Sequence, residues 1–104
     1  MADIKIEPKD FGKPLQLHMG DSIVIELQEN PTTGFRWQVS TGSHLVPSGD
    51  QFVPAKNAAP GGGGTRILKL GTVAKGNGVV RLQLRREWES SPPQQSFEVP
   101  YQVH

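Results

Sequence analysis

The apolar residues of this chain recur at every second position through most of its length, which is the period of a strand with one buried face. The pattern is clearest where Val80, Leu82 and Leu84 alternate with polar residues. No segment shows a sustained helical period, so the pattern predicts strands rather than helices. The predicted strands cover residues 4–6, 15–17, 22–27, 35–39, 67–70, 80–84 and 97–103.

Glycine and proline mark the breaks between these strands. The predicted turns are Gly12-Lys13-Pro14, Gly20-Asp21 and Gly76-Asn77-Gly78. A long irregular stretch is predicted from Ser40 to about Gly64, because most of the proline and glycine lies there. Within it, we expect Phe52 and Val53 to form a short edge strand that Pro54 stops.

About seven short strands with a turn signal roughly every ten residues are typical of an immunoglobulin-like β-sandwich. The expected fold class is therefore all-β. A chain of 104 residues is long enough for one domain with a modest core, so we expect a single domain over residues 1–104. The third major strand of such a sandwich often buries a large aromatic residue, which predicts that Trp37 is a core residue.

Charge and composition exclude several classes of function. With 11 Lys and Arg against 10 Asp and Glu, the formal net charge of +1 argues against binding nucleic acid or an anionic membrane by bulk charge. The chain has no cysteine, and therefore no disulfide, thiolate metal site or cysteine nucleophile. No stretch approaches the roughly 18 apolar residues of a membrane span, and residues 1–6 lack the basic start and apolar stretch of a signal peptide. We expect a soluble protein.

An enzyme is not indicated. His18, His44 and His104 are scattered without metal-ligand spacing, and no serine or aspartate lies in a recognisable nucleophile motif. We expect His18 and His44 to be solvated surface residues. The sequence predicts no catalytic residue, no metal and no cofactor.

The segment from Asn30 to Phe35 connects two predicted strands and is built for stiffness. Its residues are Asn30, Pro31, Thr32, Thr33, Gly34 and Phe35. Pro31 fixes its own φ, the two threonines restrict χ1, and Gly34 permits a positive φ. An ordinary strand connection needs only a Gly or an Asn-Gly pair, so six residues of this kind favour a rigid loop that contacts a partner. The alternative is an ordinary turn, because turns use the same residue types.

Four glycines, Gly61, Gly62, Gly63 and Gly64, precede the strand at residues 67–70. A phosphate-binding loop would continue with Lys and Ser or Thr and then a helix, whereas this chain continues with Thr65, Arg66 and a strand. The glycines offer either bare backbone that another chain can approach or a flexible connector.

The third segment follows the predicted strand at residues 80–84. It contains Arg86, Glu87 and Trp88 and leads into a Pro-rich loop. Trp88 is either a core residue at the rim or an exposed anchor for a partner, and the local pattern slightly favours the core.

Loops that follow the second, fourth and sixth major strands of such a sandwich can gather at one end. Taken together and in this order, the three segments resemble the chagasin-type inhibitors of papain-like cysteine peptidases. That family has Asn-Pro-Thr-Thr-Gly-aromatic, then Gly-x-Gly-Gly, then Arg-Pro-Trp. The chain matches the first motif fully, the second at Gly61, Gly63 and Gly64, and the third at Arg86 and Trp88, with Glu87 in place of proline.

The resemblance implies a reversible, tight-binding inhibitor, a monomer when free, whose three loops block the active-site cleft of a papain or cathepsin L type peptidase. It places Thr32 and Thr33 beside the catalytic cysteine, the backbone of Gly63 and Gly64 on the non-primed side, and Trp88 against an aromatic residue of the primed side. Arg86 would add polar contacts. The alternative is an immunoglobulin-like adhesion or protein-binding module without inhibitory activity.

Overall fold

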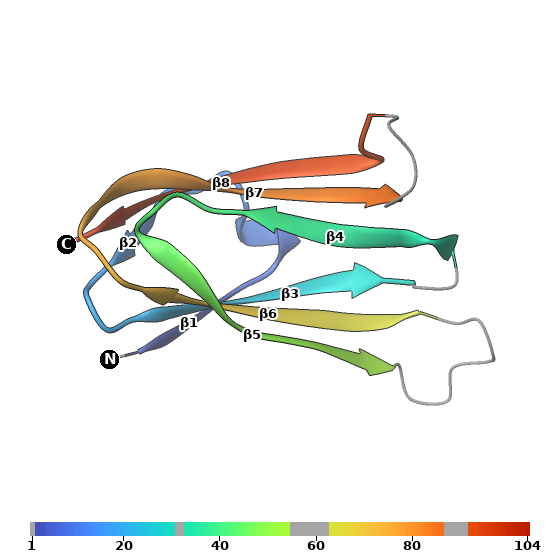
Figure 1. Ribbon diagram of the computed structural model, residues 1–104, viewed down its shortest axis with the longest axis horizontal. Helices are drawn as coiled ribbons and strands as arrows, with labels where there is room; N and C mark the ends of the chain where they lie inside the picture. The colour runs from blue at the N-terminus through green and yellow to red at the C-terminus, as the bar shows by residue number, and fades with distance from the viewer. Residues whose placement is uncertain (1, 31–32, 55–62, 87–91) are drawn as a thin grey trace.

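The strands of this protein form two layers (Figure 1). The computed structural model describes residues 2–30, 33–54, 63–86 and 92–104. Within these residues there are eight strands and one short 3-10 helix, η1 (Pro8–Asp10). The strands are β1 (Asp3–Ile6), β2 (Leu15–Leu17), β3 (Ser22–Glu29), β4 (Phe35–Ser40), β5 (Leu45–Pro54), β6 (Gly64–Thr72), β7 (Gly76–Arg86) and β8 (Gln95–Val103).

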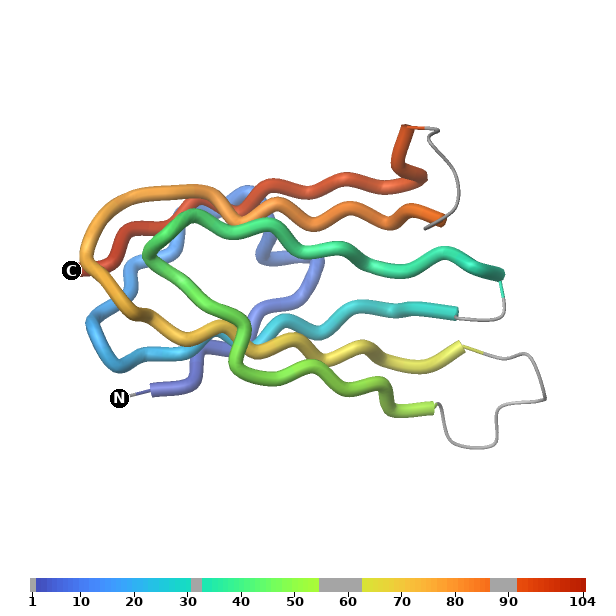
Figure 2. The backbone as a smooth tube through the Cα atoms, viewed as in Figure 1, coloured from blue at the N-terminus to red at the C-terminus, as the bar shows by residue number. Residues whose placement is uncertain are grey.

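Each layer is a four-stranded sheet. One has the order β1-β3-β6-β5 and the other β2-β8-β7-β4. The first strand of each order pairs in parallel with its neighbour, and all other pairs are antiparallel. Strands β3 and β4 follow each other in the chain but belong to different sheets, so the connection between them crosses from one layer to the other (Figure 2). The expected all-β sandwich is confirmed.

The core lies between the two sheets and is built from the alternating positions that the sequence indicated. Alternate residues of β3, β7 and β8 point inward because side chains on a strand face opposite sides of the sheet. Trp37 is 5% exposed, which confirms that it is a core residue. The fully buried large side chains are Leu17, Ile23, Ile25, Leu27, Leu45, Leu70, Leu82, Val80 and Val99.

Strand β5 corrects the expectation of a long irregular stretch from Ser40 to Gly64. It runs for ten residues rather than the two that were expected, and Pro54 belongs to the strand as its last residue. Strand β5 is the edge of its sheet, and most of its residues are exposed. Without a buried face it shows no period of two, and Pro47 lies at its bulge, where a proline is tolerated.

The predicted turn at residues 76–78 is wrong, because these residues begin β7. Gly76 and Gly78 instead allow aromatic rings to pack closely against the strand. A Cβ at Gly78 would overlap the Tyr101 hydroxyl and lie 2.7 Å from Cζ of the same ring. At Gly76, a Cβ would overlap the ring of His44. Glycine is required at both positions because an aromatic ring occupies the space of a side chain.

His44 also differs from its expected place on the solvated surface. It is partly buried, and its Nδ1 lies 2.9 Å from the Tyr101 hydroxyl, within hydrogen-bond distance. His18 is exposed as expected. Among the described residues, no helix is long and apolar enough to cross a membrane.

Candidate functional site

Strands β3, β5 and β7 end, and strands β4, β6 and β8 begin, at one end of the sandwich, opposite the end that carries the two termini (Figure 1). The connections of β3 to β4, β5 to β6 and β7 to β8 are the three segments singled out by sequence. The described parts of these segments are Asn30, Thr33, Gly34 and Phe35, then Gly63 and Gly64, then Arg86. Pro31, Thr32, Gly61, Gly62, Glu87 and Trp88 lie outside the described residues, so their expected roles stay predictions.

The segment from Asn30 to Phe35 closes on itself through hydrogen bonds of Thr33. The backbone N–H and the hydroxyl of Thr33 both donate to the carbonyl oxygen of Asn30, at 3.2 and 2.8 Å. The same hydroxyl accepts the N–H of Phe35 at 3.4 Å. Gly34 has φ 83°, which confirms the expected positive φ and disfavours any side chain there. These bonds hold the turn in one shape while Thr33 itself stays exposed.

Arg86 connects the third segment to the first. It is the last residue of β7 and pairs directly with Phe35 of β4. Its Nε donates to the carbonyl oxygen of Thr33 at 3.2 Å, and its guanidinium carbon lies 4.4 Å from the centre of the Phe35 ring. A cation over an aromatic ring is an attractive arrangement, worth about 0.5–1 kcal/mol at exposed sites. Arg86 therefore supports the turn from its side.

The second segment reaches the first through its glycines. Gly64 begins β6, lies between Glu29 of β3 and Pro54 of β5, and is buried. A Cβ at Gly64 would overlap the Val53 carbonyl oxygen and lie 2.8 Å from Cα of Pro54. Gly63 is partly buried, and a Cβ there would lie 3.6 Å from Cβ of Asn30. Gly64 thus has a packing role that the sequence did not predict.

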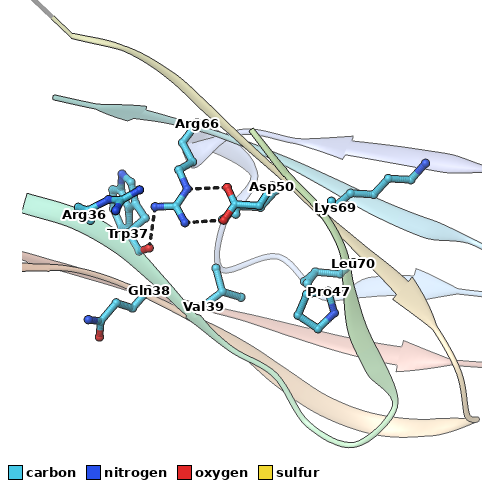
Figure 3. Close-up of a pocket in the computed structure, with 11 residues that line it drawn as sticks. Arg36, Trp37, Gln38, Val39, Pro47, Asp50, Arg66, Lys69 and Leu70 are labelled. Atoms are coloured by element: carbon cyan, nitrogen blue, oxygen red, sulfur yellow. Dashed lines mark hydrogen bonds and ion pairs between the residues drawn. The ribbon is translucent and has the colours of Figure 1, made fainter. Parts of the chain in front are cut away.

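An ionic network lies at the base of the first and second segments. The side chain of Glu29, the residue before Asn30, is fully buried, and its Oε2 accepts hydrogen bonds from Nη1 of Arg66 at 3.0 Å and from the N–H of Trp37 at 2.9 Å. Arg66 also forms two bonds to Asp50, at 2.8 and 2.7 Å (Figure 3). The hydrogen bonds from Arg66 hold the pKa of Asp50 below its usual range, and Asp50 in turn raises the pKa of Arg66. Asp50 and Arg66 therefore both stay charged at neutral pH.

The network borders a cleft of about 460 Å³ between the edge strands β4 and β5. Val39 and Pro47 lie in its lining, together with Arg66 and the backbone of Gly49 (Figure 3). No group of three or more His, Cys, Asp or Glu side chains that could hold a metal ion occurs in the part of the chain that the structure describes.

The sequence interpretation missed Glu29 and Arg66, although a signal for both was present. Glu29 continues the alternation of Ile23, Ile25 and Leu27, so a carboxylate occupies an inward position. Arg66 has the same parity as Leu68 and Leu70, which are buried. Opposite charges at inward positions on two strands indicate a buried ion pair if the strands are neighbours, and pairing of β3 with β6 makes them so.

Comparisons with known proteins show the family to which this chain belongs. Residues 16–103 match the sequence model of the family described as Chagasin family peptidase inhibitor I42. The chain belongs to the chagasin family of peptidase inhibitors. It is similar to chagasin from Trypanosoma cruzi, with 30% identity over 90 residues that cover 81% of this chain and 82% of that protein. The family is one of inhibitors, so this member is not an enzyme.

Two solved structures share the fold. The cysteine protease inhibitor EhICP2 from Entamoeba histolytica superposes with a TM-score of 0.92 at 23% identity, covering 100% of this chain and 97% of that one. Amebosin, known from its solution structure, has a TM-score of 0.82 at 23% identity and covers 98% of each chain. At this level of identity the likeness bears on the fold, and it confirms the sandwich of this chagasin-family inhibitor.

Proposed function

We propose that this protein is a reversible, tight-binding inhibitor of papain-like cysteine peptidases, of the papain and cathepsin L type. Its three segments would block the active-site cleft. The observation that carries the proposal is the closed turn from Asn30 to Phe35, which Arg86 supports from the side and next to which Gly63 of the second segment lies. The similarity in fold to a protein described as a cysteine protease inhibitor supports the choice of peptidase class.

A stiff turn suits this task. A loop that already has its bound shape loses little entropy on docking, so more of the contact energy appears as affinity. Thr32 and Thr33 would lie at the tip beside the catalytic cysteine, and the half-exposed backbone of Gly63, with Gly64, would pair on the non-primed side. Trp88 would pack on an aromatic residue of the primed side, and Arg86 would add polar contacts while holding the turn. We further propose that residues 1–104 act as one domain and as a monomer.

An inhibition assay tests the proposal against its rival, an adhesion or protein-binding module. The purified protein is added to papain and to a cathepsin L-like enzyme, and the inhibition constant is measured for each. Tight or slow-tight inhibition supports the proposal. Failure to inhibit or bind either enzyme favours the rival.

Replacing Thr32 and Thr33 together with alanine should weaken inhibition and leave the melting temperature nearly unchanged. Thr33 is exposed, so it adds little to the core, while its hydroxyl holds the turn through Asn30 and Phe35. We expect an increase of the inhibition constant of at least about tenfold, which corresponds to about 1.4 kcal/mol. The measurements are inhibition of papain and thermal unfolding.

The matched control is Thr33→Ser, which keeps the hydroxyl and therefore both hydrogen bonds that this hydroxyl makes. It should inhibit nearly as well as the wild type. Equal inhibition by the double alanine variant and the wild type would show that the tip lies elsewhere.

The inhibitor should also remain uncleaved by the peptidase that it inhibits. A tip held by Pro31 and enclosed by the partner need not present a carbonyl in the geometry of attack. After long incubation with active papain at neutral pH, mass spectrometry should find the segment from Asn30 to Phe35 intact. Stoichiometric cleavage between Thr32 and Gly34 would instead indicate a substrate-like inhibitor, and the proposed mechanism would be abandoned.

A further inference from the structure

We propose that Glu29 and Arg66 are positioning residues of the inhibitory site. Together with Trp37 they form a clasp that sets the spacing of the first and second segments, without contact to the peptidase. The inference rests on the proposed function. It begins from their burial, since the side chain of Glu29 is 0% exposed and that of Arg66 is 12% exposed.

The clasp joins the two sheets at the base of the first segment. Trp37 lies on β4, an edge strand whose outward backbone groups have no neighbouring strand in the described part of the chain. Its N–H donates to Oε2 of Glu29 at 2.9 Å, and its carbonyl oxygen accepts Nη1 of Arg66 at 3.1 Å. The Trp37 indole N–H also donates to the carbonyl oxygen of Gln28 at 2.8 Å. Both ends of the segment, one in each sheet, are therefore held to each other.

The same clasp reaches the base of the second segment. Arg66 is two residues after Gly64 on β6, and Gly64 pairs with Glu29 itself. A shift of the Glu29–Arg66 pair would move Asn30, which follows Glu29, relative to Gly63, which precedes Gly64. The two segments thus have one shared support.

Stability alone does not explain a carboxylate at this position. Burying a charge is costly even when it is paired, and a well-packed apolar pair is often as stable or more so. Oε1 of Glu29 has no hydrogen-bond partner among the described residues, and Nε of Arg36 lies 4.0 Å from it. Unlike apolar contacts, the hydrogen bonds of Glu29 and Arg66 are directional, which fixes one geometry for the strands that carry the segments.

Glu29→Gln tests the clasp, because it keeps the shape of the side chain and removes its charge. We expect inhibition of papain to weaken on the order of tenfold while the folded spectrum is retained. Arg66→Lys, which keeps the charge but cannot bridge Glu29, Asp50 and the Trp37 carbonyl at once, should weaken it similarly. The matched control is Asp50→Asn, which alters the exposed partner of the same guanidinium and leaves the bonds of Glu29 in place; its inhibition constant should stay within about twofold of the wild type.

A double-mutant cycle separates positioning from general stability. If Glu29 acts through the first segment, the losses from Glu29→Gln and Thr33→Ala will be less than additive. Additive losses, or wild-type inhibition by both Glu29→Gln and Arg66→Lys, would overturn the inference while the proposed function stands.

A second readout is independent of any peptidase. Hydrogen exchange of the Thr33 amide, which is bonded to Asn30, should be faster in Glu29→Gln than in Asp50→Asn. If the wild type inhibits no papain-like enzyme, the proposed function fails, and this comparison still decides whether the clasp holds the segment. Equal exchange in the two variants would overturn the clasp.

Discussion

Replacing Trp37 with alanine is expected to lower the free energy of unfolding by about 3–5 kcal/mol, the usual range for a large aromatic side chain removed from a core. Trp37 is 5% exposed, and its ring stacks on Phe97 with centroids 5.9 Å apart. The variant also removes the indole N–H that donates to the carbonyl oxygen of Gln28. Urea unfolding followed by circular dichroism measures the change.

Trp37→Phe is the matched control, since it keeps an aromatic ring at this position while it removes the indole N–H and part of the volume of the bicyclic ring. Loss of that hydrogen bond should cost about 1–3 kcal/mol, so this variant should be more stable than Trp37→Ala. A cost below about 1 kcal/mol for Trp37→Ala would contradict the placement of this ring in the core.

Replacing Trp88 with alanine is expected to have the opposite effect. It should cost little stability but about 2 kcal/mol or more of binding, which raises the inhibition constant about thirtyfold. The hypothesis behind this expectation is that the strand ends near Arg86, the last described residue of β7, and that Trp88, which lies outside the described residues, is carried outward by the loop. Inhibition of papain and urea unfolding are measured on the same preparation.

Trp88→Phe, which retains an aromatic side chain, should recover part of the lost inhibition. If Trp88→Ala instead unfolds the domain as severely as Trp37→Ala, Trp88 is a core residue. The third segment would then lack its anchor.

The fold could largely be predicted from sequence wherever a strand has one buried face. In β3, β7 and β8 the alternation of apolar and polar residues indicated both the strand and its inward side. Strand β5 could not be found in this way, because an edge strand exposed on both faces leaves no alternation. Gly76 and Gly78 were misread because glycine in a turn and glycine beneath an aromatic ring look the same in sequence.

The candidate site, like the fold, could be predicted from sequence only in part. Motif order and spacing indicated the inhibitor family, which the comparisons confirm, and Gly34 has the positive φ that its turn predicted. The hydrogen bonds of Thr33 and the contact of Arg86 with Phe35 depend on the pairing of β4 with β7 and were not predictable from either segment alone.

The sequence by itself therefore determined the all-β class, the buried faces of the main strands and the inhibitor motifs, because each depends on residues close together in the chain. The tertiary structure decided how the segments are held. Glu29 and Arg66 are 37 residues apart, and only the register of β3 against β6, with β4 of the other sheet alongside, makes them a pair that also binds the backbone of Trp37. An interaction between strands depends on how the strands pack, and the local pattern of one strand does not predict which strand lies next to it.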